Sequence, residues 1–159
     1  MSAYSTHIDI PAASRDKAIA LLNQQLADTF DLFSQIKQAH WNVKGMHFIA
    51  LHELFDKLAE EAEDYVDDIA ERATALGGVA VGTARASAKN SRLPEFPLEG
   101  VHGKVAVEAL VERYALLAAS TRKAIETAAG FGDADTSDLF TGVSRGLDKS
   151  LWFLEAHLQ

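Results

Sequence analysis

Cysteine is absent from the 159 residues, and only three prolines occur. The absence of cysteine excludes disulfide scaffolds, thiolate catalysis, and zinc or iron–sulfur sites with cysteine ligands. No apolar run approaches the roughly 18 residues that a membrane-spanning helix needs. The first residues also lack the basic and then apolar pattern of a secretory signal. We therefore expect a cytoplasmic protein that does not enter a membrane.

Acidic residues outnumber basic ones, with 23 Asp and Glu against 15 Lys and Arg, so the formal charge is −8. An excess of negative charge disfavours nucleic acid as an electrostatic partner and favours cations. The composition is otherwise ordinary for a globular protein, with 48% hydrophobic and 24% charged residues. The length fits a single domain.

Four long stretches carry apolar residues at steps of three and four, which is the pattern of amphipathic helices. The first follows Pro11 with Ser14 as its expected cap, and the second follows Gly45. The third begins near Val107, and the fourth begins near Asp135. No stretch shows the alternation that is typical of a strand.

The second and third helical stretches are separated by a long connection from Gly77 to Gly103, with a short helix expected at residues 83–88. A link of this length can run along a whole bundle, and it makes the two helices that it joins parallel. We therefore expect an all-α, ferritin-like four-helix bundle. Residues 1–13 would form a short tail, and residues 14–159 the domain.

One face of the second helix concentrates ionisable residues. At about 100° per residue, six of them project within one narrow sector; they are His52, Asp56, Glu60, Glu63, Asp67 and Glu71. A solvated face normally mixes charges of both signs, whereas stacked carboxylates repel one another. Carboxylates with imidazole suit iron, manganese or zinc. On this pattern alone, a solvated face and a metal site both remain open.

The two ends of this face lie too far apart to share one ion, since His52 and Glu71 are about 28 Å apart along a straight helix. The six positions are, however, symmetric about a point between residues 61 and 62. An antiparallel copy of the helix across a two-fold axis would bring His52 and Asp56 to Glu71 and Asp67 of the other subunit. His40 could add an imidazole. No Glu-x-x-His pair is present, which disfavours a di-iron centre within one bundle.

Residues 40–45 (HWNVKG), followed by Leu51-His52 and Asp56, strongly resemble the Dps family, also called mini-ferritins. Residues 67–72 (DDIAER) form a second match, and residues 144–153 a weaker third. The resemblance implies a homo-dodecameric shell, built from two-fold dimers, that stores ferric mineral. It also implies oxidation of Fe(II), preferably with hydrogen peroxide, although dioxygen is an alternative.

The resemblance also assigns residues. The family's di-iron ligands correspond to His40, His52 and Asp56 of one subunit, with Asp67 and Glu71 of its two-fold partner. Trp41 corresponds to a tryptophan beside the centre that captures oxidising equivalents, although packing in the core is an equally open interpretation.

Acidic residues at the start of the last helical stretch correspond to pore residues of the family. Asp133 and Asp138 are the candidates for lining a pore through which iron enters. The alternative is local, because aspartate is a favoured residue at the cap and in the first turn of a helix.

The family members that bind DNA often carry a mobile, lysine-rich tail. Residues 1–11 contain no Lys or Arg, and affinity for DNA depends on neutralising phosphates. We therefore expect weak or absent DNA binding. A nucleoid-associated protein that protects DNA by covering it is the alternative function.

Overall fold

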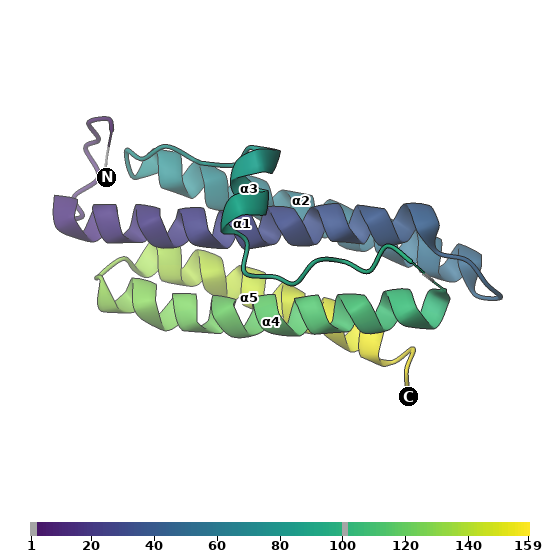
Figure 1. Cartoon of the computed structure of the whole chain (residues 1–159). Helices are drawn as coiled ribbons and strands as arrows, with labels where there is room; N and C mark the ends of the chain where they lie inside the picture. Colours follow the sequence, from purple (N-terminus) through teal and green to yellow (C-terminus); the bar gives the residue numbers. More distant parts are fainter. Residues whose placement is uncertain (1–2, 100–101) are drawn as a thin grey trace.

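Helices account for all of the regular secondary structure in the residues that the computed structural model describes, 3–99 and 102–159 (Figure 1). The helices are α1 (Ala12–Asn42), α2 (Phe48–Ala75), α3 (Ala84–Asn90), α4 (Gly103–Gly130) and α5 (Ala134–Glu155). The most extensive contacts join α1 to α2 and α4 to α5. These two pairs form one four-helix bundle, and the expected ferritin-like fold is confirmed.

The connection between α2 and α4 runs along the bundle beside α1, with α3 in its middle (Figure 1). It leaves α2 at one end of the bundle and enters α4 at the other, so α2 and α4 are parallel, as the length of the connection predicts. Thr83 caps α3, its hydroxyl accepting a hydrogen bond from the Ala86 amide at 3.3 Å. The short helix expected at residues 83–88 is therefore present.

Buried polar contacts hold this connection against the bundle. The Asp28 carboxylate, which is almost fully buried, accepts from the Arg92 backbone amide at 2.7 Å and from its Nε at 2.9 Å. Further along, the Gln35 amide donates to the Pro94 carbonyl at 3.1 Å and accepts from Arg113 Nε at 2.9 Å. A buried charge is tolerated when it is paired in this way.

Two helices begin earlier than the sequence predicts. Pro11 rather than Ser14 is the N-cap of α1, because the Pro11 carbonyl already accepts from the amides of Ser14 and Arg15. Helix α4 begins at Gly103, before the apolar stripe that starts at Val107. Lys104 and Val105 in its first turn are exposed, and the buried residue there is the small Ala106, so this turn shows no stripe of large apolar residues.

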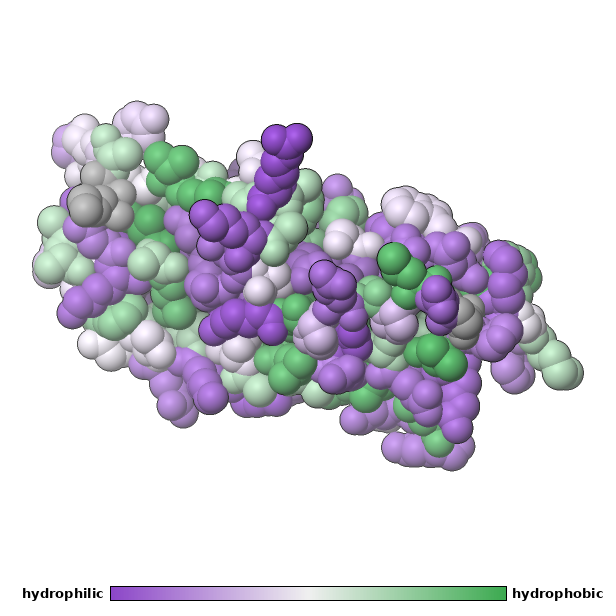
Figure 2. Space-filling view, in the orientation of Figure 1, coloured by the Kyte–Doolittle hydropathy of each residue, from purple (hydrophilic) through white to green (hydrophobic). Residues whose placement is uncertain are grey.

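Apolar side chains from all four long helices fill the bundle; the largest of those that are fully buried include Phe55, Tyr114, Phe140, Leu22 and Ile36. Polar residues cover most of the face seen in Figure 2, with apolar residues scattered between them. Among residues 3–99 and 102–159, no helix is long and apolar enough to cross a membrane.

Candidate metal centre

His40 in the last turn of α1 and His52 in the second turn of α2 lie against each other. Their rings stack with centroids 3.8 Å apart and an interplanar angle of 20°. Nδ1 of His40 lies 2.9 Å from the His52 carbonyl, and Nδ1 of His52 lies 2.9 Å from the His40 carbonyl. A carbonyl can only accept, so each Nδ1 carries a proton, and in the neutral ring Nε2 then has the lone pair. Both imidazoles are thus oriented as metal ligands.

The tight connection between α1 and α2 creates this arrangement. Gly45 adopts φ 116°, a backbone conformation that glycine readily supplies. Its carbonyl accepts from the Phe48 amide at 3.1 Å, and the fully buried Val43 anchors the end of α1. The chain reverses within a few residues, so the last turn of α1 lies opposite the beginning of α2.

Asp56 adds a carboxylate one turn after His52. Its Oδ1 lies 3.8 Å from His40 Nε2 and 2.7 Å from Lys37 Nζ. The hydrogen bond from Lys37, together with the charges of Lys37 and of the imidazoles, lowers the pKa of Asp56 below its ordinary value. The carboxylate is therefore held in the ionised form that binds cations. Sequence reasoning missed Lys37, although its position one turn before His40 on α1 places it on the same face.

Asp67 and Glu71 lie further along α2 with exposed side chains. The structure brings His40, His52 and Asp56 together, but it does not bring Asp67 or Glu71 to them. Within the described part of the chain, no group of three or more His, Asp or Glu side chains is arranged to hold a metal by itself. The described residues of one chain therefore do not complete a metal site by themselves.

Trp41 does not pack in the core of this chain, since 63% of it is exposed. Lys37 Nζ lies 5.9 Å from the centre of its ring. Because Lys37 also contacts Asp56, the indole lies beside the candidate centre. The interpretation of Trp41 as a core residue is therefore wrong for the single chain.

Asp133 does not fit the pore-lining role expected from the sequence. Its side chain is fully buried, and it caps α5 by accepting from the Thr136 amide at 3.1 Å. It also accepts from Arg72 Nη2 at 2.7 Å. A carboxylate enclosed by these partners has no face to offer a channel. Asp138, by contrast, is exposed and lines a surface cavity of about 370 Å³.

The comparisons with known proteins agree with this architecture. Residues 19–159 match the profile of the ferritin-like domain family. The DNA protection during starvation protein of Agrobacterium fabrum is 43% identical over 159 residues, covering 100% of this chain and 98% of that protein. The chain belongs to the Dps family.

Solved Dps structures have the same fold as this Dps chain. The Mycobacterium smegmatis Dps aligns with a TM-score of 0.93 at 31% identity, covering 100% of this chain and 95% of that one. The Vibrio cholerae Dps aligns with a TM-score of 0.91 at 25% identity, covering 100% and 98% of the two chains. The Vibrio protein is described as a member of a broad superfamily of ferritin-like diiron-carboxylate proteins.

The ionisable groups between the helices of this Dps bundle differ from those at the α1–α2 connection, because among the described residues they include two tyrosines and no histidine pair. Glu61 accepts a short hydrogen bond from the Ser150 hydroxyl. Burial raises the pKa of Tyr65 and of Tyr114, and the charge of Glu61 adds to both effects. The phenols of Tyr65 and Tyr114 with the Glu61 carboxylate do not form a set of ligands for two irons.

Proposed function

We propose that this Dps protein is a ferroxidase that oxidises Fe(II) and stores the ferric product. The observation that carries the proposal is the pair of imidazoles, His40 and His52, each bonded to a carbonyl through Nδ1 so that Nε2 is left for a metal, beside the ionised Asp56. Imidazole nitrogen and carboxylate oxygen form a ligand set suited to iron. Fe(II) is the substrate, with hydrogen peroxide as the preferred oxidant and dioxygen as the alternative.

In this proposal, Asp67 and Glu71 of a two-fold related subunit complete each site. Two observations support it: the described residues of one chain do not complete a metal site, and the six ionisable positions of α2 are symmetric about its midpoint. An isologous dimer then holds two equivalent sites, each with an iron pair. Six such dimers would form the homo-dodecameric shell that the family resemblance implies.

The residues of the site have separate tasks. An imidazole that binds through its nitrogen lone pair adds no charge, and Asp56 offsets part of the charge of the bound cations. Two Fe(II) ions give up one electron each, and a hydrogen peroxide molecule takes both electrons and two protons to form two water molecules. Because both electrons arrive together, no hydroxyl radical is released. Trp41 lies where it can donate an electron if a stray oxidant forms.

Iron entry is a separate part of the proposal. Asp138 is exposed on the first turns of α5, so copies related by symmetry could present a ring of carboxylates. Such a ring would concentrate Fe(II) at the opening of the shell.

The function is tested by anaerobic titration of Fe(II)-loaded protein with hydrogen peroxide. The wild type should oxidise about two Fe(II) per peroxide, whereas His52→Ala should slow oxidation by roughly 10- to 100-fold, since loss of metal-site groups typically costs this much. Glu53→Ala, at the adjacent exposed position, is the matched control and should oxidise iron at the wild-type rate. A His52→Ala protein with unchanged kinetics would exclude this site as the ferroxidase centre.

DNA protection by direct binding is the alternative function, and the acidic chain does not favour it. Residues 3–11 contain no Lys or Arg, and the amides of Ala3 and Tyr4 donate to the Gly77 carbonyl at 2.8 and 3.0 Å. Ala3 and Tyr4 are thus bound to the turn after α2, and residues 3–11 offer no Lys or Arg to a phosphate. A tight, salt-sensitive gel shift at pH 7 would contradict this expectation.

A further inference from the structure

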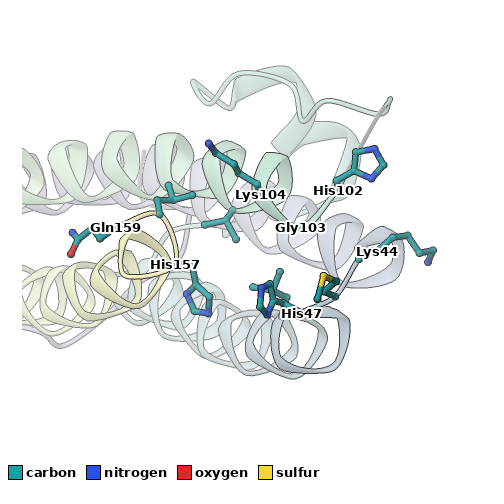
Figure 3. A pocket seen from close by; sticks show the side chains of 12 residues that line it. Lys44, His47, His102, Gly103, Lys104, His157 and Gln159 are labelled. Carbon is teal, nitrogen blue, oxygen red and sulfur yellow. The ribbon is translucent and has the colours of Figure 1, made fainter.

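A separate cavity of about 510 Å³ lies at the end of the bundle, where the α1–α2 connection, the start of α4 and the residues after α5 meet (Figure 3). Five basic side chains line it, and no Asp or Glu side chain does; the five are Lys44, His47, His102, Lys104 and His157. None of them belongs to the candidate metal centre.

This concentration of basic residues runs against the composition of the chain. Acidic residues number 23 in a sequence with a net charge of −8, yet among the described residues the ionisable side chains that line the cavity are all basic. Three of the six histidines gather here from three separate elements. A concave, one-sign surface attracts ions of the opposite sign.

The backbone adds to this potential. Helices α2 and α4 both begin beside the cavity, and neither carries an acidic residue in its first turn or a side-chain cap. The partial positive charge at the two helix starts is therefore not offset by a local carboxylate.

The basic groups differ in where they point. Lys44 extends away from the space between His47 and His157 (Figure 3), and its Nζ lies 5.8 Å from the centre of the Phe48 ring. Nδ1 of His157 donates to the Phe153 carbonyl at 2.7 Å, and its ring points to the same space as that of His47 (Figure 3). Lys104 has only an exposed contact of 3.7 Å with Glu108, and such pairs are weak.

The chemistry of the lining favours an anion over a metal cation. Two ammonium groups would repel a cation, and the described lining residues include no Asp or Glu side chain to attract one. The described residues here also do not form a group of three metal ligands. The remaining wall includes Met46, Leu51 and Val107, so the cavity combines positive charge with apolar surface. Its volume is in the range of small-molecule sites.

We propose that this cavity binds a small phosphate-bearing anion, either free phosphate or a phosphate monoester with an apolar portion. The basic side chains would hold the phosphate, and the apolar wall would contact the rest of the molecule. The proposal is independent of iron oxidation, because the two sets of residues do not overlap.

Calorimetric titration of the assembled, metal-free protein with inorganic phosphate and with adenosine monophosphate tests this proposal. Both probes should bind with one site per chain, and the monophosphate should bind more tightly because it also contacts the apolar wall. Lys44→Gln combined with Lys104→Gln should weaken both by at least about tenfold, since hydrogen bonds to charged groups contribute at this level.

Lys89→Gln, an exposed lysine on α3, is the matched control and should bind both probes as the wild type does. The double variant should still oxidise Fe(II) at the wild-type rate, which separates this site from the ferroxidase centre. Absence of saturable binding in the wild type would overturn the proposal. Equal binding by the wild type and the double variant would also overturn it.

Discussion

His40 and His52 each donate from Nδ1 to the backbone carbonyl of the other, at 2.9 Å in both directions. The orientation of both rings is therefore set by the backbone of the α1–α2 connection and needs no further side chain. Substitution of either histidine removes one ligand, but it leaves the carbonyl partner of the other in place. Because both rings are already oriented before iron binds, binding loses less side-chain conformational entropy.

Lys37 occupies the position of a competing cation at the candidate centre. Its Nζ lies 2.7 Å from Asp56 Oδ1, so a metal ion must displace it and overcome its charge. We predict that Lys37→Met tightens Fe(II) binding by roughly 3- to 10-fold. Anaerobic calorimetry measures it, with the exposed Lys57→Met as control. Weaker binding would show instead that Lys37 positions Asp56 for the metal.

The Arg72–Asp133 pair is a structural element rather than part of a pore. Asp133→Asn keeps a residue that can cap α5, but it leaves Arg72 without its buried counter-charge. We predict a loss of about 2–4 kcal/mol in the free energy of unfolding. Asp135→Asn is the matched control, because Asp135 lies 3.8 Å from the same arginine with its side chain 82% exposed. Equal stability of both variants in denaturant titrations would contradict this assignment.

Tyr114 should make the protein sensitive to alkali. Burial raises its pKa well above 10.0, so the folded chain keeps a proton that the unfolded chain releases above about pH 10. The free energy of unfolding therefore falls as the pH rises above 10, by up to about 1.4 kcal/mol per pH unit for this group.

Tyr114→Phe removes this effect. Thermal unfolding between pH 8 and 11 should show a shallower decline for Tyr114→Phe than for the wild type. Tyr4→Phe, at a position that is 68% exposed, is the control for the loss of a phenol. An unchanged slope in Tyr114→Phe would contradict the prediction.

Much of the fold follows from periodicity and spacing alone. The apolar stripes predict the four long helices, and the length of the Gly77–Gly103 connection predicts that α2 and α4 are parallel. Both predictions are confirmed, because amphipathic helices in a bundle depend on patterns that a single sequence displays directly. The residue at which a helix begins is harder to predict from periodicity. Helix α4 begins at Gly103, before its stripe of large apolar residues, because its first turn is mostly exposed.

The candidate site could be predicted only in part. The spacing on α2 selects His52 and Asp56, but periodicity alone does not reveal that His40 stacks on His52, which depends on the geometry of the turn at Gly45. The sequence leaves Asp133 open between a pore residue and a helix cap, because its partner Arg72 is distant in sequence. Pairings between remote positions depend on how the helices pack together.

The central claim is that each ferroxidase centre combines ligands of two subunits, and mixed assembly tests it most directly. One variant combines His52→Ala with Asp56→Ala, and the other combines Asp67→Ala with Glu71→Ala. Each should be inactive by itself in peroxide-driven Fe(II) oxidation. If they are unfolded together and reassembled, random pairing should restore about a quarter of the wild-type sites, because each mixed dimer contains one intact site. Recovery to that level is the predicted result, and no recovery in properly assembled mixed shells would contradict the shared site.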